Sequence, residues 1–144
     1  PESARFIESI DPPEQFVFHA VGLAHRDGPM RFCAPAKPGR PNFTSDHEGA
    51  RFPPDRTVEA PAKRLSTLMA KLGHDHVDVL KIDIEGAEVP LLEKLLASEA
   101  CKNIDYIFVE THEFMIPELM ERTDALYRVA ARMRRPSSPN PWKL

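Results

Sequence analysis

Glycine is scarce and widely spaced in this sequence. The 144 residues contain six glycines, and no two of them lie closer than six positions apart. A Gly-x-Gly turn, which lets a backbone approach a cofactor closely in many α/β proteins, is therefore absent. The sequence thus lacks the usual means by which such proteins hold the phosphate or ribose end of a nucleotide-like ligand.

Cysteine, net charge and long apolar runs are also limited. Cys33 and Cys101 are the two cysteines, and their wide separation indicates free thiols in a reducing cytoplasm. The formal net charge of -3, with scattered basic residues, argues against a nucleic-acid partner. No apolar stretch approaches the roughly 20 residues of a membrane span, and no signal-peptide pattern is visible. We therefore expect a cytoplasmic protein without a membrane partner, and the sequence leaves its oligomeric state open.

Apolar residues and prolines, by contrast, are plentiful. Hydrophobic residues make up 42% of the chain, enough for one domain with a core, which we assign to residues 1–133. Residues 134–144 are rich in proline and serine and predict a loose tail. Residues 34–56 show no periodicity and predict a long loop. Because residue 1 is a proline already inside a helical pattern, we expect a fragment of a longer protein.

The first half of the chain predicts one helix and an apolar strand with a hairpin partner. Residues 3–10 are amphipathic and end before Asp11 and two prolines. Residues 15–23 (QFVFHAVGL) are rich in aromatic and β-branched residues and predict a buried strand. A turn signal then leads into an alternating segment at residues 29–33, which indicates a hairpin. A short strand is expected at residues 57–60.

The second half alternates between helices and strands. Ser66 is a candidate cap for a helix that ends at Lys71, with Gly73 at the position after its end. The remaining elements are short apolar runs and longer helical patterns, which indicate βαβ units and a mostly parallel sheet. We expect strands at residues 77–83 (VDVLKID) and 104–110 (IDYIFVE), and helices at residues 88–97 and 115–133.

Acidic residues gather where these strands end. Asp83, Glu85 and Glu88 follow the first of the two strands, and Glu110 and His112 follow the second. Open α/β sheets bind their ligands at the carboxyl edge of their strands. The sequence therefore predicts a site at this edge, formed by neighbouring parallel strands.

The segment LKIDIEGAE at residues 80–88 resembles the signature of FkbM-type methyltransferases, which use S-adenosylmethionine. Other pieces occur in the order found in that family. They are HAVG at residues 19–22, RLSTL at residues 64–68 and VETH at residues 109–112. The resemblance extends from about Phe6 to His112.

This resemblance implies a partial Rossmann-like α/β fold of the class I methyltransferases, with a mostly parallel sheet and flanking helices. Sheets of that class run in the strand order 3-2-1-4-5, so residues 15–23 would be the third strand and residues 77–83 the fourth. The first two strands, with their glycine-rich turn, would be missing. The two strands at 15–23 and 77–83 would then either pair directly or lie detached, and the chain alone would be inactive.

The resemblance also implies roles for individual residues. The reaction would transfer a methyl group to a hydroxyl of a sugar or natural product, so the partner would be a small-molecule or glycan acceptor. The expected catalytic residues are Asp83, Glu110 and His112, and no metal is expected. The expected cofactor contacts are Ala20, Val21 and Asp83, and the expected substrate contacts are Glu85 and Glu88.

The same residues also allow structural interpretations and other functions. Asp83 is also a candidate helix cap, and Glu85 and Glu88 suit the start of a helix because of its dipole. A metal-dependent hydrolase is an alternative, because oxygen-rich clusters with histidine suit Mg²⁺ or Mn²⁺. That hydrolase would use Asp83, Glu85, Glu88, Glu110 and His112. A non-catalytic binding module is the other alternative.

Overall fold

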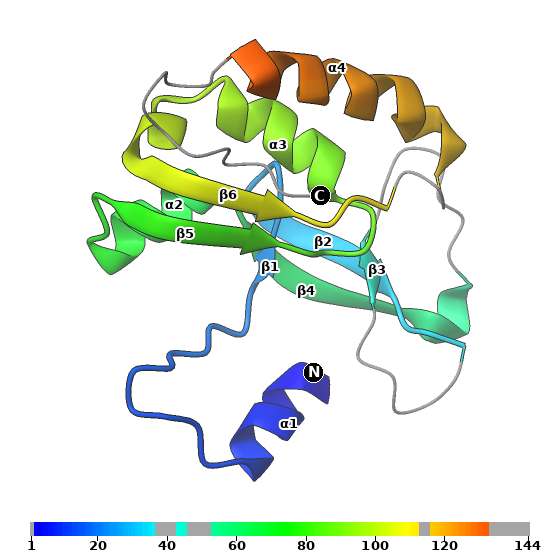
Figure 1. Cartoon of the computed structure of the whole chain (residues 1–144). Coiled ribbons are helices and arrows are strands. Elements are labelled where there is room, and N and C mark those ends of the chain that lie inside the picture. The colour runs from blue at the N-terminus through cyan, green and yellow to red at the C-terminus, as the bar shows by residue number, and fades with distance from the viewer. Residues whose placement is uncertain (1, 37–42, 46–52, 113–115, 133–144) are drawn as a thin grey trace.

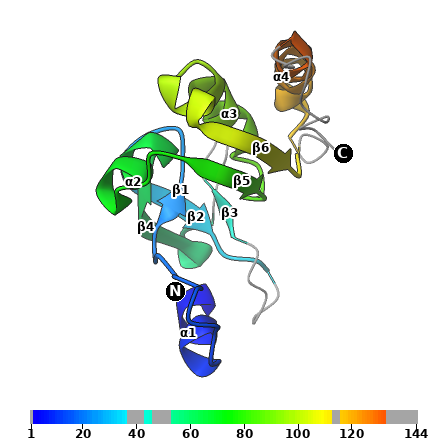
Figure 2. The same cartoon turned by 60° about the vertical axis from the view of Figure 1, so that its left-hand side comes forward.

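The chain is an α/β protein with two small sheets and several helices (Figure 1). The computed structural model describes residues 2–36, 43–45, 53–112 and 116–132. One sheet has four strands in the order β1-β4-β2-β3, and the other contains β5 and β6. Figures 1 and 2 show α3 and α4 above the β5–β6 pair, with the four-stranded sheet below it.

The pair of strands that carries the acidic residues is parallel, as the sequence predicts. β5 (Val77–Ile82) lies directly beside β6 (Ile104–Val109). Helix α3 (Glu88–Leu96) and a 3-10 turn, η2 (Glu99–Asn103), connect them. The two strands run in the same direction, so both carboxyl ends lie at one edge.

The main core lies between this strand pair and the helices. Its buried members are aliphatic residues of β5, α3 and β6, and each is at most 5% exposed. Leu23 from the first sheet and Leu65 from α2 pack against this core at its border. The core thereby joins the two sheets, and its buried members are Ile82, Leu91, Leu92, Leu95 and Ile107.

The four-stranded sheet differs from the expected hairpin. The strand β4 (Thr57–Lys63) lies between β1 (Gly22–Leu23) and β2 (Gly28–Cys33), so β1 and β2 are not neighbours. β1 pairs with β4 in parallel, whereas β2 pairs with β4 and with β3 (Thr44–Ser45) in antiparallel fashion. Two of the four strand pairings among the described residues are therefore antiparallel, and the prediction of a mostly parallel sheet was wrong. The long-range partner β4 displaces the local hairpin.

The predicted strand at residues 15–23 was also largely wrong. Only Gly22 and Leu23 form a strand, and they lie in a different sheet from β5. Phe16 is 48% exposed and Val17 is 69% exposed. An apolar segment becomes a buried strand only where another strand satisfies its backbone and a neighbouring layer covers its side chains. The described residues offer neither at 15–21, so this segment runs past the sheet without joining it.

The helices agree more closely with the sequence. α1 (Glu2–Ser9) lies apart from both sheets in Figures 1 and 2. α2 (Leu65–Leu72) ends at Gly73, whose φ of 70° is left-handed, as predicted. Ser66 does not cap this helix, because it lies inside the first turn and the capping position is Arg64.

The remaining segments contain more order than the sequence indicates. Within residues 34–56, the described part includes β3 and the 3-10 turn η1 (Pro54–Arg56). The helix expected at 115–133 is found as α4 (Met120–Arg132) after a 3-10 turn, η4 (Pro117–Leu119). The tail at residues 134–144 lies outside the described residues.

Two further expectations concern the thiols and membranes. Cys33 and Cys101 are free, and burial raises the pKa of the Cys101 thiol. Among the helices that the structure describes, none has the length and apolar character needed to cross a bilayer.

Candidate active site

The turn between β5 and α3 has an unusual backbone. Glu85 has a φ of 54° and Gly86 a φ of 105°, so two consecutive residues adopt left-handed conformations. A side chain at position 86 would also collide with Ile116, since an added Cβ would lie 2.7 Å from Ile116 Cδ1. The turn therefore requires glycine at position 86, and it reverses the chain tightly enough to direct the following helix back over the strands.

The carboxylate of Glu88 holds this turn from inside. Glu88 is 1% exposed. Its Oε1 accepts a hydrogen bond of 2.9 Å from the backbone N–H of Ile84, and its Oε2 accepts one of 2.9 Å from Gly86. Burial of a carboxylate is costly unless hydrogen bonds compensate, and here both oxygens are satisfied.

The same carboxylate also holds a buried histidine. His112 Nδ1 lies 2.9 Å from Glu88 Oε1. Because both oxygens of Glu88 already act as acceptors, we assign the hydrogen of this bond to Nδ1 of His112. His112 is 7% exposed, so its ring is fixed by burial as well as by this bond.

The other ring nitrogen faces the remaining acidic residues. His112 Nε2 lies 3.7 Å from Glu85 Oε2 and 4.0 Å from Asp83 Oδ1. Ligand atoms of Asp83, Glu110 and His112 lie within 4.8 Å of one another. The edge therefore combines a fixed imidazole with carboxylates from the ends of β5 and β6, as the sequence predicts for their positions.

Electrostatics favour the charged form of this histidine. Burial alone lowers the pKa of His112, but the hydrogen bond and charge of Glu88 and the nearby carboxylates of Glu85 and Asp83 outweigh it. The net effect raises the pKa of His112 above its ordinary value.

The side chain of Asp83 pairs with a lysine, whereas a helix cap would accept a hydrogen bond from a backbone N–H at the start of α3. Its Oδ2 lies 3.2 Å from Lys81 Nζ, and its side chain is 37% exposed. The capping position of α3 is Ala87, with no side-chain cap. The helix-cap interpretation of Asp83 was therefore wrong, and the carboxylate faces the edge.

The predicted cofactor contacts lie elsewhere along the chain. Ala20 is exposed and Val21 partly buried, and both precede β1. None of the hydrogen bonds or ion pairs among the described residues joins them to the acidic edge. Their role in cofactor binding stays a prediction.

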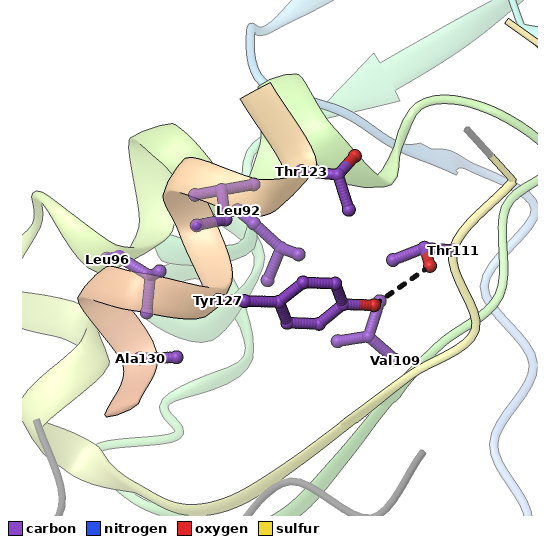
Figure 3. A pocket seen from close by; sticks show the side chains of 8 residues that line it. Leu92, Leu96, Val109, Thr111, Thr123, Tyr127 and Ala130 are labelled. Carbon is purple, nitrogen blue, oxygen red and sulfur yellow. Dashed lines mark hydrogen bonds between the residues drawn. The ribbon is translucent and has the colours of Figure 1, made fainter. Parts of the chain in front are cut away.

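The sequence interpretation overlooked Tyr127 of α4. Its hydroxyl lies 3.2 Å from Thr111 Oγ1, next to His112 in the sequence (Figure 3). The ring lines a small cavity of about 10 Å³, together with Val109 at the end of β6, Thr111, and residues of α3 and α4 such as Leu92. That volume accepts at most a single water, so this cavity is part of the packing behind the site. In the sequence, the feature that could have indicated this contact is a tyrosine beside the apolar stripe of the last helix.

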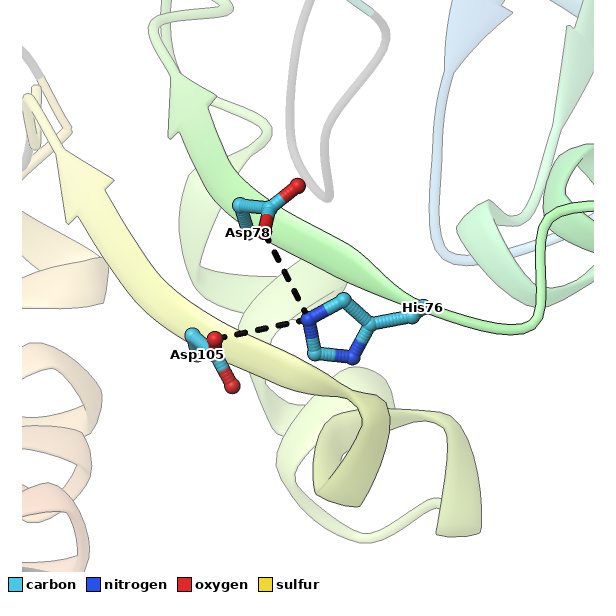
Figure 4. Close-up of side chains that lie close together, drawn as sticks. All are labelled: His76, Asp78 and Asp105. Carbon is cyan, nitrogen blue, oxygen red and sulfur yellow. Dashed lines mark ion pairs between the residues drawn. The ribbon is translucent and has the colours of Figure 1, made fainter.

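A second cluster of similar composition lies at the opposite end of the strand pair. His76 Nε2 lies 3.7 Å from Asp78 Oδ1 and 3.4 Å from Asp105 Oδ2 (Figure 4). Asp78 and Asp105 face each other across β5 and β6, where like charges are unfavourable, and His76 lies between them. All three side chains are exposed, at the amino ends of the strands and away from the buried histidine.

The histidine and the carboxylates described above lie at the carboxyl ends of β5 and β6. This is the edge at which α/β proteins commonly bind ligands and place reactive groups. The chain belongs to the FkbM methyltransferase family, since the model of the methyltransferase FkbM domain matches residues 6–132. This match confirms the resemblance and extends it through α4. Comparisons with curated proteins and with solved structures gave no match.

The tight turn gives the first prediction. Gly86→Ala combines backbone strain with a collision against Ile116, so we expect a loss of about 2–4 kcal/mol in the free energy of unfolding. Gly28→Ala is the matched control, because Gly28 also has a positive φ of 121° but no atom within 4 Å of an added Cβ. Chemical denaturation of both variants measures the difference. Equal losses would show that Ile116 yields without cost.

The Glu88 contacts give the second prediction. Glu88→Gln replaces one accepting oxygen with a donor, so a buried partner loses its acceptor, and we expect a loss of about 1–3 kcal/mol. The pKa of His112 should fall at the same time, as followed by NMR. Glu110→Gln, an isosteric change at an exposed carboxylate, should cost no more than about 0.5 kcal/mol.

The sign of the pH dependence follows from the raised pKa of His112. Folding favours the protonated ring, so the stabilisation is fully present below the ordinary pKa and is lost as the pH rises through the folded-state pKa. In Glu88→Gln this loss should be smaller and should be complete at a lower pH than in the unaltered protein, because the folded-state pKa of His112 is lower there. Identical pH profiles for the two proteins would contradict the assigned role of Glu88.

Proposed function

We propose that this chain is part of an S-adenosylmethionine-dependent methyltransferase that methylates a hydroxyl oxygen of a small molecule or glycan. Membership of the FkbM methyltransferase family supports the reaction class. The buried His112, held at Nδ1 by Glu88 and facing Asp83 and Glu85 through Nε2, is the single observation that carries the proposal. The free thiols agree with the reducing cytoplasm that we propose as its location.

In this proposal His112 accepts the proton of the acceptor hydroxyl at Nε2. The bond to Glu88 keeps the hydrogen on Nδ1, which leaves Nε2 to act as the base. Glu85, Asp83 and Glu110 surround the point where the hydroxyl would lie, so they orient the acceptor through hydrogen bonds. Nearby carboxylates raise the pKa of His112, so Nε2 can accept a proton only at pH values above that raised pKa, and methyl transfer should increase as the pH rises through it.

Glu88 takes a different role from the predicted substrate contact. Its carboxylate is buried and its oxygens bond to Ile84, Gly86 and His112. We therefore propose Glu88 as a positioning residue that fixes the turn and the histidine. Glu85, which is nearer the surface, keeps the proposed role of contacting the acceptor.

The cofactor, when bound, supplies an electrophilic methyl group. We propose a Rossmann-like arrangement in which β5 and β6 are the fourth and fifth strands and β1 belongs to the third. Asp83, Ala20 and Val21 remain the proposed cofactor contacts. The glycine-rich turn that such sites use does not occur within these 144 residues. We infer that this chain alone forms only part of the cofactor site.

Calorimetry tests that inference. Titration of S-adenosylmethionine into the chain should give no saturable binding in the micromolar range, because no Gly-x-Gly turn is available for close backbone approach. S-adenosylhomocysteine, which lacks the transferred methyl group, is the matched ligand and should behave in the same way. Micromolar affinity for either would mean that these residues already form a complete pocket.

Asp83→Asn tests the edge directly. In a form of the protein that binds the cofactor, we expect methyl transfer to fall by roughly tenfold or more, because the substitution keeps the shape and removes the charge. Asp78→Asn is the matched control, since it makes the same change at the amino end of the same strand and should leave turnover unaltered.

The outcomes separate the proposed reaction from the hydrolase alternative. Methyl transfer that is unaffected by Asp83→Asn would rule out the role of Asp83. A divalent-ion requirement with no methyl transfer would instead favour metal-dependent chemistry at Asp83, Glu110 and His112.

A further inference from the structure

A cavity of about 250 Å³ lies between α2, α3 and the turn that follows β1. It shares no lining residue with the carboxylate edge. His25, Arg64 and Lys94 give it three basic side chains, and Ser66 and Ser98 add hydroxyl groups. The rest of its lining is alanine and leucine, so no carboxylate lines it among the described residues.

The first turn of α2 opens onto this cavity. α2 has eight residues and begins at Leu65, and the Arg64 side chain makes no capping bond. The first backbone N–H groups of a helix have no acceptor within it, and Leu65 and Ser66 both line the cavity. The positive end of the helix dipole therefore adds to the basic side chains.

Acidic groups near the cavity are engaged with other partners. Asp27 accepts hydrogen bonds from the backbone and guanidinium of Arg64 and from Thr67. Glu93 forms two hydrogen bonds, of 2.9 and 2.6 Å, with Arg122. Asp27 therefore offsets both the charge of Arg64 and part of the positive end of α2, which leaves Lys94 as the principal positive side chain of the lining.

His25 provides an independent observation at the same place. Its Nδ1 is fully buried and has no hydrogen-bond partner within the described part of the chain. Burial, followed by the charges of Arg26, Lys94 and Arg122, lowers the pKa of His25, and Glu93 opposes this only in part. Since Nδ1 has no exposed surface, an oxyanion in the cavity would act on the ring through its charge, and this charge would favour the protonated form of His25.

We propose that this cavity binds the phosphate group of a small phosphate monoester. Lys94 and the first-turn amides of α2 contact the phosphate oxygens, the His25 ring lies near their charge, and Leu65, Leu91 and Leu95 contact the organic part. A phosphate suits donors that approach from several elements, because its oxygens accept hydrogen bonds in several directions and carry about two charges. This inference does not depend on methyl transfer at the carboxylate edge.

NMR titration with phenyl phosphate tests the proposal on the full chain. Its phosphate matches the basic groups, and its ring matches the leucines. The His25 resonance is assigned by its loss in His25→Gln. At constant ionic strength, phenyl phosphate should raise the pKa of His25 by about one unit.

Two variants with the same charge change locate the effect. Lys94→Gln should weaken phenyl phosphate binding by about tenfold. Lys102→Gln should leave binding unchanged, because Lys102 pairs with Glu99 and does not line the cavity. Both lysines are exposed, and circular dichroism checks that both variants fold.

Three results would overturn the proposal. The first is an equal His25 shift with chloride at the same ionic strength, which would indicate general screening. The second is equal weakening by the Lys94 and Lys102 substitutions. The third is binding of benzoate as tight as that of phenyl phosphate, which would exclude selection of a phosphate.

Discussion

Three hydrogen bonds to one buried carboxylate organise the edge of this protein where chemistry is expected. Glu88 lies at the start of α3, yet it bonds back to the turn that precedes the helix and across to His112 after β6. A buried carboxylate can persist only if its oxygens are satisfied, so the turn, the helix start and the strand end must adopt their positions together. The left-handed residues Glu85 and Gly86 are the backbone requirement of the same arrangement.

This constraint explains how a small strand pair can hold a precise site. The two strands offer few ladder bonds, and an isolated pair is marginal in water. α3 covers the pair from one side through aliphatic packing, and α4 adds the bond between Tyr127 and Thr111. His112 is thereby supported from its own segment, from Glu88 and from the packing behind it. Carboxylates on the solvent side, such as Asp83, keep enough exposure to meet a ligand.

Much of this half of the fold can be predicted from the sequence, because its signals are local. The runs at β5 and β6 have the length and apolar character of buried parallel strands, and Gly73 stands where a left-handed helix end needs it. The first half depends on distant partners instead. β4 lies between β1 and β2, and no local pattern in the sequence predicts that a distant strand takes this place. The apolar residues 15–21 have the composition of a strand, but composition does not reveal whether a neighbouring strand is present.

The site shows the same division. The sequence brings Asp83, Glu110 and His112 to one edge because parallel strands end together. It does not reveal that Glu88 turns inward, since that depends on two consecutive left-handed residues. Tyr127 was overlooked because a tyrosine beside an apolar stripe usually belongs to packing, and here its hydroxyl also reaches Thr111.

The unequal cores of the two sheets have a consequence for how the molecule opens. Among the described residues, the strand pair shares a core of five buried aliphatic residues, whereas the four-stranded sheet has a cluster of three, Ala24, Met30 and Ala62, with the partly buried Phe32 packed against it. Little apolar area opposes local opening of the four-stranded sheet. Its backbone amides should therefore exchange with solvent through partial unfolding events that leave β5, α3 and β6 intact. The fold then behaves as two cooperative units of unequal stability, with His112 and Glu88 in the more stable one.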